Sequence, residues 1–291
     1  MAFNCLSVNF MHKDEFLNLS QTKDFVKYFG DLITKKTNLN FVYSSGRYES
    51  FDEALSAYRW PNKRVDISTP DGVLVIGANS NFNENKIVLD KLGKGIKRSF
   101  EKNDTEAVAA WSQSIMVWGG VYTRRGNAAW LDENRLSINE YLRSSISVLN
   151  QDDDEAPLQM PNLRSNAGTT KIYSLLLPNF IIYDSRVSAA LAWLVFQWAQ
   201  KNSIDVADYL RFSCMRANSK RKKIRSPDEK IFKYFAATGK FHYRHAMWNL
   251  RANWVVEAAL KYSQAQDGIP IDSRSIEAAL FMLGADLSGN L

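Results

Sequence analysis

Hydrophobic residues recur at intervals of three and four along most of this chain, the spacing of one face of an α-helix. In the first half, the pattern predicts helices over residues 83–100, 104–118 and 136–149. The second of these stops at Gly119-Gly120, a common kind of helix end. In the second half, the pattern predicts helices over residues 169–177, 186–200, 204–213, 227–237, 243–262 and 273–283.

Local signals add one short helix and two candidate strands. Ser50 and Glu53 have the spacing of a capping box, which predicts a helix that continues through Ala57. Residues 39–43 and 73–76 are short apolar stretches that form one hairpin or none. The expected core positions of the helix over 83–100 are Ile87, Leu89 and Ile96. The sequence therefore predicts a mainly α fold with at most a small β element.

An acidic stretch divides the chain near its middle. Residues 151–157 contain four adjacent acids, and Pro157 follows closely. Adjacent like charges before a proline favour an exposed loop or linker. We therefore expect two helical lobes, residues 1–150 and 156–291.

The composition is typical of a folded protein in a reducing compartment. Hydrophobic residues make up 45% of the 291 residues, which suffices for one large domain or for two lobes that share a core. Cys5 and Cys214 lie far apart and form no Cys-x-x-Cys pair, which argues against a thiolate zinc site and a disulfide framework. The N-terminus lacks the features of a signal peptide and no apolar run reaches membrane-spanning length, so we expect a cytoplasmic protein outside the membrane.

Positive charge is concentrated in one stretch of the chain. The formal net charge is +6, and residues 211–225 contain seven cations and no acid. These cations are Arg211, Arg216, Lys220, Arg221, Lys222, Lys223 and Arg225. A run of one sign repels itself unless an anion neutralises it, which favours a nucleic-acid partner. The alternative is a solvated loop.

Residues 166–191 carry the candidate chemistry. Gly168 precedes a predicted helix, and an apolar connection over 180–183 leads to Asp184 at the start of the next one. An acid in the first turn is favoured by the helix dipole and can accept hydrogen bonds from backbone N–H groups. Asp184 is therefore either an ordinary N-cap or a carboxylate with a chemical role.

In its order of parts this stretch resembles the helix-hairpin-helix DNA glycosylase superfamily. There, a glycine-containing hairpin leads into a helix, an apolar connection follows, and an aspartate opens the next helix before a valine and a basic residue. The residues that stand in this order are Gly168, Thr169, Lys171, Asp184, Arg186 and Val187. The chain has one glycine where the family's hairpin usually has two, and its lysine-to-aspartate interval is shorter.

The resemblance implies a two-lobed, glycosylase-like fold that binds double-stranded DNA between its lobes without a metal or organic cofactor. Asp184 would stabilise the positive charge that develops on the sugar as an N-glycosidic bond breaks, and would take a proton from the attacking water. Because the interval is short, we interpret Lys171 as a phosphate contact or an ordinary surface residue and not as a Schiff-base nucleophile. The expected DNA-binding residues are Gly168, Thr169, Lys171, Arg186, Arg216, Lys220, Arg221, Lys222, Lys223, Arg225 and Arg244.

An enzyme that excises a base must first move the target nucleotide out of the duplex and into a pocket. The best candidate is the segment 118–127, where two glycines allow the backbone to approach a ligand closely. Its expected pocket residues are Trp118, Tyr122, Arg125 and Asn127. The alternative is a helix terminator followed by a basic turn.

Motifs of other enzyme classes are absent from the sequence. It contains no phosphate-binding loop, no dinucleotide-binding turn and no nucleophile elbow. His242 and His245 lie three residues apart without a third ligand nearby, so we expect no metal site. Together with Arg244 they are better interpreted as a basic aromatic face that either contacts the DNA backbone or is solvated.

The leading hypothesis is a DNA glycosylase, without strand cleavage of its own, that hydrolyses the N-glycosidic bond of a modified or damaged base and leaves an abasic site. Divergent members of the superfamily excise modified bases, including glucosylated hydroxymethylcytosine, from phage DNA, and the analogy extends to a role in phage defence. The alternative is a non-catalytic DNA-binding protein, such as a regulator or a defence-system subunit. It would use the same cations and would not need Asp184.

Overall fold

The computed structural model of the chain describes residues 10–217, 222–236, 238–267 and 271–291. Its α-helices are α1 (Lys13–Asn18), α2 (Ser20–Ile33), α3 (Phe51–Ser56), α4 (Phe82–Glu101), α5 (Thr105–Trp118), α6 (Ala129–Glu133), α7 (Ile138–Leu149), α8 (Thr169–Leu176), α9 (Ser185–Asn202), α10 (Phe241–Asp267) and α11 (Ser273–Leu283). The shorter helical segments are η1 (Arg124–Ala128), η2 (Arg135–Ser137), η3 (Ala156–Gln159) and η4 (Asp208–Leu210). The strands are β1 (Phe41–Tyr43), β2 (Gly46–Tyr48), β3 (Val65–Thr69) and β4 (Gly72–Ile76). The prediction of a mainly α fold is confirmed.

The β element is small but differs from the prediction in its pairing. The two expected strands belong to separate antiparallel hairpins, β1–β2 and β3–β4. In the first, Phe41 pairs with Tyr48, and in the second, Val65 pairs with Ile76. Each expected strand therefore pairs with a neighbour that the hydrophobic pattern does not reveal.

Side-chain caps fix the beginnings of the helices that frame the site. The Ser50 hydroxyl accepts a hydrogen bond from the Glu53 amide at 3.3 Å, as the capping-box spacing predicts. Asn81 and Asp104 cap α4 and α5 in the same way, and Asp272 caps α11. Because each cap satisfies an otherwise unpaired backbone donor, the predicted and observed starts of these helices agree to within two residues.

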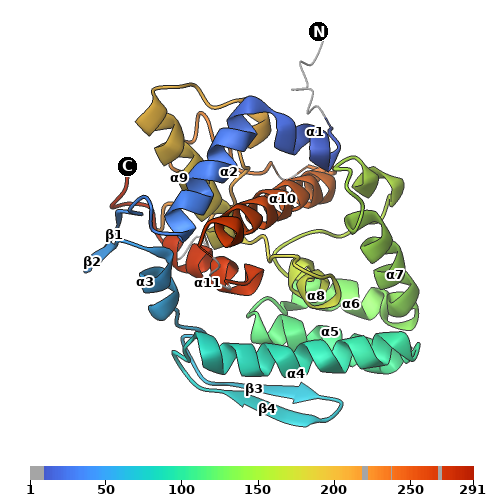
Figure 1. The fold of residues 1–291 in the computed structure, drawn as a ribbon. Helices are drawn as coiled ribbons and strands as arrows, with labels where there is room; N and C mark the ends of the chain where they lie inside the picture. The colour runs from blue at the N-terminus through green and yellow to red at the C-terminus, as the bar shows by residue number, and fades with distance from the viewer. Residues whose placement is uncertain (1–9, 218–221, 237, 268–270) are drawn as a thin grey trace.

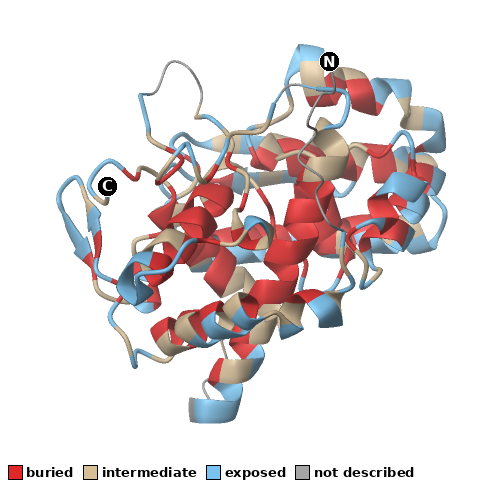
Figure 2. Ribbon diagram, turned by 90° about the horizontal axis from the view of Figure 1, so that it is seen from above, coloured by how far each residue is buried: buried red, intermediate tan, exposed pale blue. Residues whose placement is uncertain are grey.

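The helices surround α10, which crosses the middle of the molecule (Figure 1). The amino-terminal helix α2 packs along α10, and α11 packs against both α9 and α3. Helix α8 contacts α4 and α5, which in turn support the β3–β4 hairpin. Figure 2 shows the result: the central helices are buried around most of their circumference, and exposed residues lie at the periphery.

A single hydrophobic cluster runs through residues on both sides of the acidic stretch. Helices α1 and α2 were not predicted, and they pack against helices from the second half of the chain. The ring centroids of Phe25 and Trp198, for example, lie 5.8 Å apart. The division into lobes at residues 1–150 and 156–291 remains a prediction, but helices α1 and α2 are in contact with the second segment.

Two predicted helices are absent from the described residues. Of the helix expected over 204–213, only η4 forms, and residues 227–236 contain no helix. The Cys214 amide instead donates to Lys233 O at 3.0 Å, and the Phe235 amide donates to Cys214 O at 3.0 Å. Since this pairing satisfies the backbone of both segments, tertiary contacts override the helical pattern.

The acidic stretch is a loop that is only partly exposed: Asp152 and Glu155 are exposed, as its charges predict, but other residues of the stretch are buried. Asp154 is buried, and its Oδ2 accepts a hydrogen bond from Arg251 Nε at 2.6 Å. Ala156 and Pro157 are buried as well. The exposure of Ile87 is a second correction, because this expected core position is 58% exposed whereas Leu89 and Ile96 are buried. No helix among the described residues is long and apolar enough to cross a membrane.

Candidate functional site

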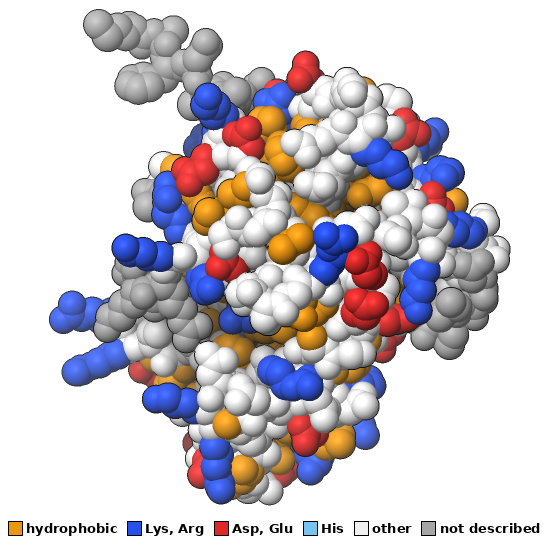
Figure 3. Space-filling model, turned by 90° about the vertical axis from the view of Figure 1, so that its left-hand side faces the viewer, with side chains coloured by type: hydrophobic (Ala, Val, Ile, Leu, Met, Phe, Trp, Pro, Cys, Tyr) orange, Lys and Arg blue, Asp and Glu red, His pale blue; other side chains and the backbone are white. Residues whose placement is uncertain are grey.

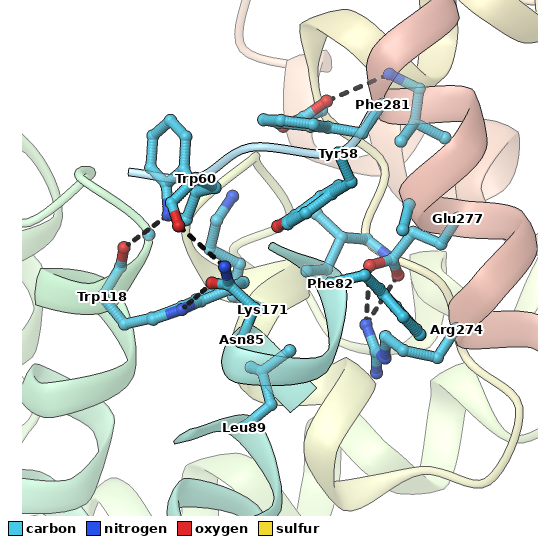
Figure 4. Close-up of a pocket in the computed structure, with 15 residues that line it drawn as sticks. Tyr58, Trp60, Phe82, Asn85, Leu89, Trp118, Lys171, Arg274, Glu277 and Phe281 are labelled. Atoms are coloured by element: carbon cyan, nitrogen blue, oxygen red, sulfur yellow. Dashed lines mark hydrogen bonds and ion pairs between the residues drawn. The ribbon is translucent and has the colours of Figure 1, made fainter. Parts of the chain in front are cut away.

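A pocket with aromatic walls opens where α4, α5, α8, α9 and α11 meet the loop after α3 (Figure 4). Its cavity volume is about 50 Å³, which is below the usual size range of small-molecule sites. We call it the aromatic pocket, after the five rings that line it: Tyr58, Trp60, Phe82, Trp118 and Phe281. Its polar lining residues are Asn85, Lys171, Asp184, Arg274 and Glu277.

One wall of the aromatic pocket is held by a closed ring of three hydrogen bonds, which Figure 4 shows as dashed lines. Trp60 Nε1 donates to Trp118 O at 3.0 Å, and Trp118 Nε1 donates to Asn85 Oδ1 at 3.1 Å. Asn85 Nδ2 closes the ring by donating to Trp60 O at 2.7 Å. The ring ties α4, α5 and the loop after α3 together, so this wall is already ordered without a ligand.

The opposite wall carries a saturated ion pair. Arg274 Nη1 donates to both carboxylate oxygens of Glu277 at 2.7 Å, and Arg274 Nη2 donates to Ser174 O at 3.0 Å. Glu277 Oε2 also accepts from the Ile182 amide at 2.6 Å. Burial raises the pKa of Glu277, although the adjacent Arg274 opposes this shift. Both side chains thus hold the wall and have little capacity left for a ligand.

Asp184 caps α9 with only one of its two carboxylate oxygens. Its Oδ1 accepts hydrogen bonds from the Arg186 amide at 2.8 Å and from the Val187 amide at 3.0 Å, which caps α9. Its Oδ2 accepts no hydrogen bond from any of the described residues, and Asp184 lines the aromatic pocket. The two interpretations of this residue are therefore compatible, because one oxygen serves the helix and the other is available to the pocket.

Lys171 lies in the same pocket, on the buried helix α8. Only 6% of the residue is exposed, and its Nζ donates to Ala167 O at 2.7 Å. Burial lowers the pKa of Lys171, while the negative charges of Asp184 and Glu277 act in the opposite direction. Its side-chain stem lies against Gly119, where an added β-carbon would overlap the lysine Cδ and Cε. The site thus places an amine with an increased neutral fraction beside a carboxylate.

The segment expected to form the pocket is only partly in place. Trp118 lines the aromatic pocket, but Tyr122, Arg125 and Asn127 do not. Tyr122 donates its hydroxyl proton to Gln113 at 3.2 Å, and Arg125 is exposed. Asn127 is buried in a separate network, where its Oδ1 accepts from Asn166 Nδ2 at 3.0 Å. These three residues lie outside the aromatic pocket because the chain turns away after α5, and their expected role in a base pocket remains a prediction.

The start of α8 is a capped turn without a glycine-dependent conformation. Asn166 Oδ1 accepts from the amides of Gly168 and Thr169 at 2.7 and 3.1 Å. Gly168 has φ −85°, a value open to any residue, but an added β-carbon would overlap the Asn127 amide group. Gly168, Thr169 and Lys171 are all buried. Their predicted contact with DNA remains a prediction, and their burial argues against it.

The predicted cations occupy three different environments. Arg216, Lys222 and Lys223 are exposed, Arg186 and Arg244 are half-buried, and Arg225 is buried. The guanidinium of Arg186 stacks on the Phe281 ring at 4.0 Å, which places it beside the aromatic pocket. Arg244 lies elsewhere, in a hollow with Trp248. Lys220 and Arg221 lie outside the described residues.

The two histidines serve the interior. His245 Nδ1 lies 2.8 Å from Ser165 Oγ, and His242 Nδ1 lies 2.8 Å from Ser165 O. Burial lowers the pKa of His245 to about 3, so this ring is neutral at physiological pH. Within the described ranges, no group of three or more potential ligand side chains could hold a metal ion.

Sequence reasoning missed most of the pocket lining. Tyr58, Trp60, Phe82 and Phe281 come from three separate elements that carry no motif. Glu277 alone gave a usable signal, because it is an acid on the face of an otherwise apolar helix beside Ile276 and Leu280. Comparison of the chain with family models, with curated proteins and with solved structures finds no match.

Proposed function

We propose that this protein is a DNA glycosylase that breaks the N-glycosidic bond of a modified or damaged base. One observation carries the proposal: an uncommitted carboxylate oxygen of Asp184 and the buried amine of Lys171 share a pocket with aromatic walls. Reactive groups held apart from solvent in such a pocket are a typical feature of active sites.

The reaction requires a negative charge beside C1′ of the sugar. As the bond between C1′ and the base nitrogen breaks, its electron pair leaves with the base and positive charge builds on the sugar. Asp184 Oδ2 would stabilise that charge and would accept a proton from the water that attacks C1′. Since Oδ1 stays bound to the α9 amides, the carboxylate is oriented before the substrate arrives.

The pocket walls favour recognition of the base by stacking. Asn85, Arg274 and Glu277 are occupied by the hydrogen bonds described above, so they offer few groups to the edge of a base. The aromatic rings of the lining, of which Trp60 and Phe281 meet edge to face with centroids 5.7 Å apart, offer apolar surface against which a flat ligand can pack. Recognition through shape and stacking suits a base that has been expelled from the duplex.

The buried state of Lys171 favours a second, covalent form of the same reaction. A neutral amine is a nucleophile, and burial lowers the pKa of Lys171. Its attack on C1′ would form a carbon–nitrogen bond as the base departs with its electron pair, and opening of the sugar would give an imine. Loss of the 3′ phosphate by β-elimination would then cut the strand, an outcome that hydrolysis does not give.

The test is Asp184→Asn, with Asp272→Asn as the matched control, because both acids cap a helix and only Asp184 lines the pocket. Duplexes with modified, damaged and ordinary bases are incubated with each protein, and free base is measured by mass spectrometry. We expect Asp184→Asn to slow release by about 10²- to 10³-fold with DNA binding intact, and Asp272→Asn to have no effect. Equal rates for all three proteins would refute the proposal.

Trapping with borohydride separates the two forms of the reaction. Reduction of an imine joins protein and DNA irreversibly, and Lys171→Met should abolish that product. Base release without a trapped product assigns the hydrolytic form. If no substrate releases a base while the protein still binds DNA in a salt-dependent way, the alternative of a non-catalytic DNA-binding protein holds.

A further inference from the structure

A second hollow lies next to the aromatic pocket and collects positive charge. It contains about 1150 Å³ of empty space between the β1–β2 hairpin, the start of α9 and the carboxyl-terminal residues. We call it the basic hollow, because Arg186, Lys223 and Arg225 line it together with one acid, Asp286. Figure 3 shows the face that carries this hairpin, with Lys and Arg side chains projecting along one margin.

The basic hollow has one acid in its lining, Asp286. Asp286 is fully used: its Oδ2 contacts Lys223 Nζ at 2.8 Å, and its Oδ1 accepts from the amides of Ile224 and Ser288 at 3.2 and 3.3 Å. The lining therefore has three basic residues and one acid whose two oxygens are already engaged. An anion in the hollow would relieve the repulsion among the cations.

Arg225 gives the strongest evidence for a ligand site in the basic hollow. It is only 5% exposed, and its Nη1 donates to Gly284 O. Its Nε is buried and has no hydrogen-bond partner among the described residues. Burial and the nearby charge of Arg186 lower the pKa of Arg225 to about 10, so the protein holds two guanidinium groups in mutual repulsion.

The basic hollow and the aromatic pocket share their dividing wall. Trp60 lines the pocket and Asn62, two residues later, lines the hollow. Phe281 and Met282, adjacent on α11, are divided between the two in the same way. Consecutive Cα atoms are about 3.8 Å apart, so the wall between the two spaces is thin. A ligand that extends over this wall can occupy both spaces.

We propose that the basic hollow binds a phosphodiester of the substrate strand, next to the nucleotide whose base enters the aromatic pocket. This inference rests on the proposed function, since that function places a nucleotide in the pocket. The stacked rings of Tyr43 and Tyr48, with centroids 4.3 Å apart, form a wall of the same hollow. They give the neighbouring sugar or base a surface to pack against.

The experiment measures DNA binding in the Asp184→Asn background, so that its result does not depend on base release. Lys223→Ala should weaken binding several-fold and reduce the slope of log Kd against log salt by about one. Asp286→Asn, which removes the one acid of the hollow, should strengthen binding. Lys261→Ala is the matched control, because Lys261 is also an exposed lysine paired with a half-buried acid, Glu257. It should leave both quantities unchanged.

The opposite signs distinguish a phosphate site from local damage. If Asp286→Asn weakens binding as Lys223→Ala does, or if Lys223→Ala matches Lys261→Ala, the inference is overturned while any measured base release still stands. A second arm replaces one phosphate beside the target nucleotide with a neutral methylphosphonate. The methylphosphonate should weaken DNA binding by the Asp184→Asn protein that retains Lys223. It should have little further effect on DNA binding by the protein that also carries Lys223→Ala.

Inorganic phosphate identifies the source of the anion. Calorimetry tests whether the protein with Lys223 intact binds inorganic phosphate. If it does, and if no methylphosphonate substitution changes DNA binding, the hollow binds a free anion and the assignment to the DNA strand is overturned. Dependence on one neutral linkage, suppressed by Lys223→Ala, supports the assignment.

Discussion

Two regions of the molecule bring an acid and a buried base together, and they do so in opposite ways. Where the acidic stretch meets α10, Asp154 accepts from Arg251 Nε at 2.6 Å and from the Met11 amide at 2.8 Å, so both of its oxygens are occupied. In the aromatic pocket, Asp184 commits one oxygen to its helix, and Lys171 donates to a carbonyl of its own segment. No ion pair joins Asp184 to Lys171 in the described part of the chain.

The difference separates a structural pair from the pair that we propose to be reactive. Burial raises the pKa of Asp154 and lowers the pKa of Arg251, so desolvation opposes both charges and their short contact compensates for it. In the pocket, Lys171 donates to the Ala167 carbonyl, but no ion pair among the described residues compensates for its burial. A saturated pair has nothing left to offer a ligand, whereas the pocket retains an oxygen and an amine.

The largest expected effect comes from breaking the structural pair. Arg251→Met leaves Asp154 buried without its partner, and we expect the free energy of unfolding in urea to fall by about 3–5 kcal/mol. The double variant Asp154→Leu/Arg251→Met removes both charges and should recover most of that loss. A loss below about 1 kcal/mol in the single variant would show that the pair is not the structural contact argued above.

Displacement of the Lys171 amine should have the next largest effect, on the rate of base release. An alanine side chain at Gly119 would overlap the stem of Lys171, which must then move. Because a displacement of about 1 Å at a reacting group can cost about 100-fold in rate, we expect Gly119→Ala to slow base release by up to that factor. Gly239→Ala is the control, since an added β-carbon there contacts nothing within 4 Å. Equal rates in the two variants would contradict a role for the position of Lys171.

Local signals explain which parts of this comparison could be predicted from the sequence. The cap at Asp104 and the glycines after Trp118 bound α5 as expected, and Asp184 begins α9 as expected. Each of these features depends on residues within one turn of each other. The burial of Asp154 depends on Arg251, which is 97 residues away, so a run of acids looked like an exposed loop.

The site was harder to predict than the fold for the same reason. Lys171 looked like a surface residue, but α8 is enclosed by α4 and α5, so that nearly all of its side chains are buried. The wall made by Trp60, Asn85 and Trp118 joins three elements through hydrogen bonds that no short motif encodes. The amphipathic pattern of α2, with Phe25, Phe29 and Leu32 buried, was present in the sequence and was missed.

Disruption of the hydrogen-bonded wall of the aromatic pocket should have an intermediate effect on the free energy of unfolding. Asn85→Leu keeps similar bulk but leaves the Trp118 indole N–H and the Trp60 carbonyl without their partner. A lost buried partner costs about 1–3 kcal/mol, and we expect a loss of unfolding free energy in that range. Asn134→Leu is the control, because the side chain of Asn134 makes one hydrogen bond, within its own helical turn. A similar loss in both variants would show that the ring of hydrogen bonds adds no stability of its own.

The smallest expected effect has the opposite sign and concerns Lys171. Burial depresses its folded-state pKa below the ordinary 10.5, so the unfolded chain binds more protons in the window between the two values. The stability of the protein with Lys171 therefore rises with pH through that window. Lys171→Met, which removes the cost of burying the amine, should be more stable by about 1 kcal/mol at neutral pH, as is common when a functional group is replaced. This advantage should shrink as the pH approaches 10.5.

Urea unfolding at a series of pH values measures the advantage, with exposed Lys261→Met as the control that should show no such trend. An advantage that does not change with pH would mean that the gain comes from apolar packing of the methionine. In that case folding does not depress the pKa of Lys171, and the amine stays protonated in the folded state at neutral pH. A protonated amine is not a nucleophile, so that result would remove the covalent form of the reaction and leave Asp184 with an activated water.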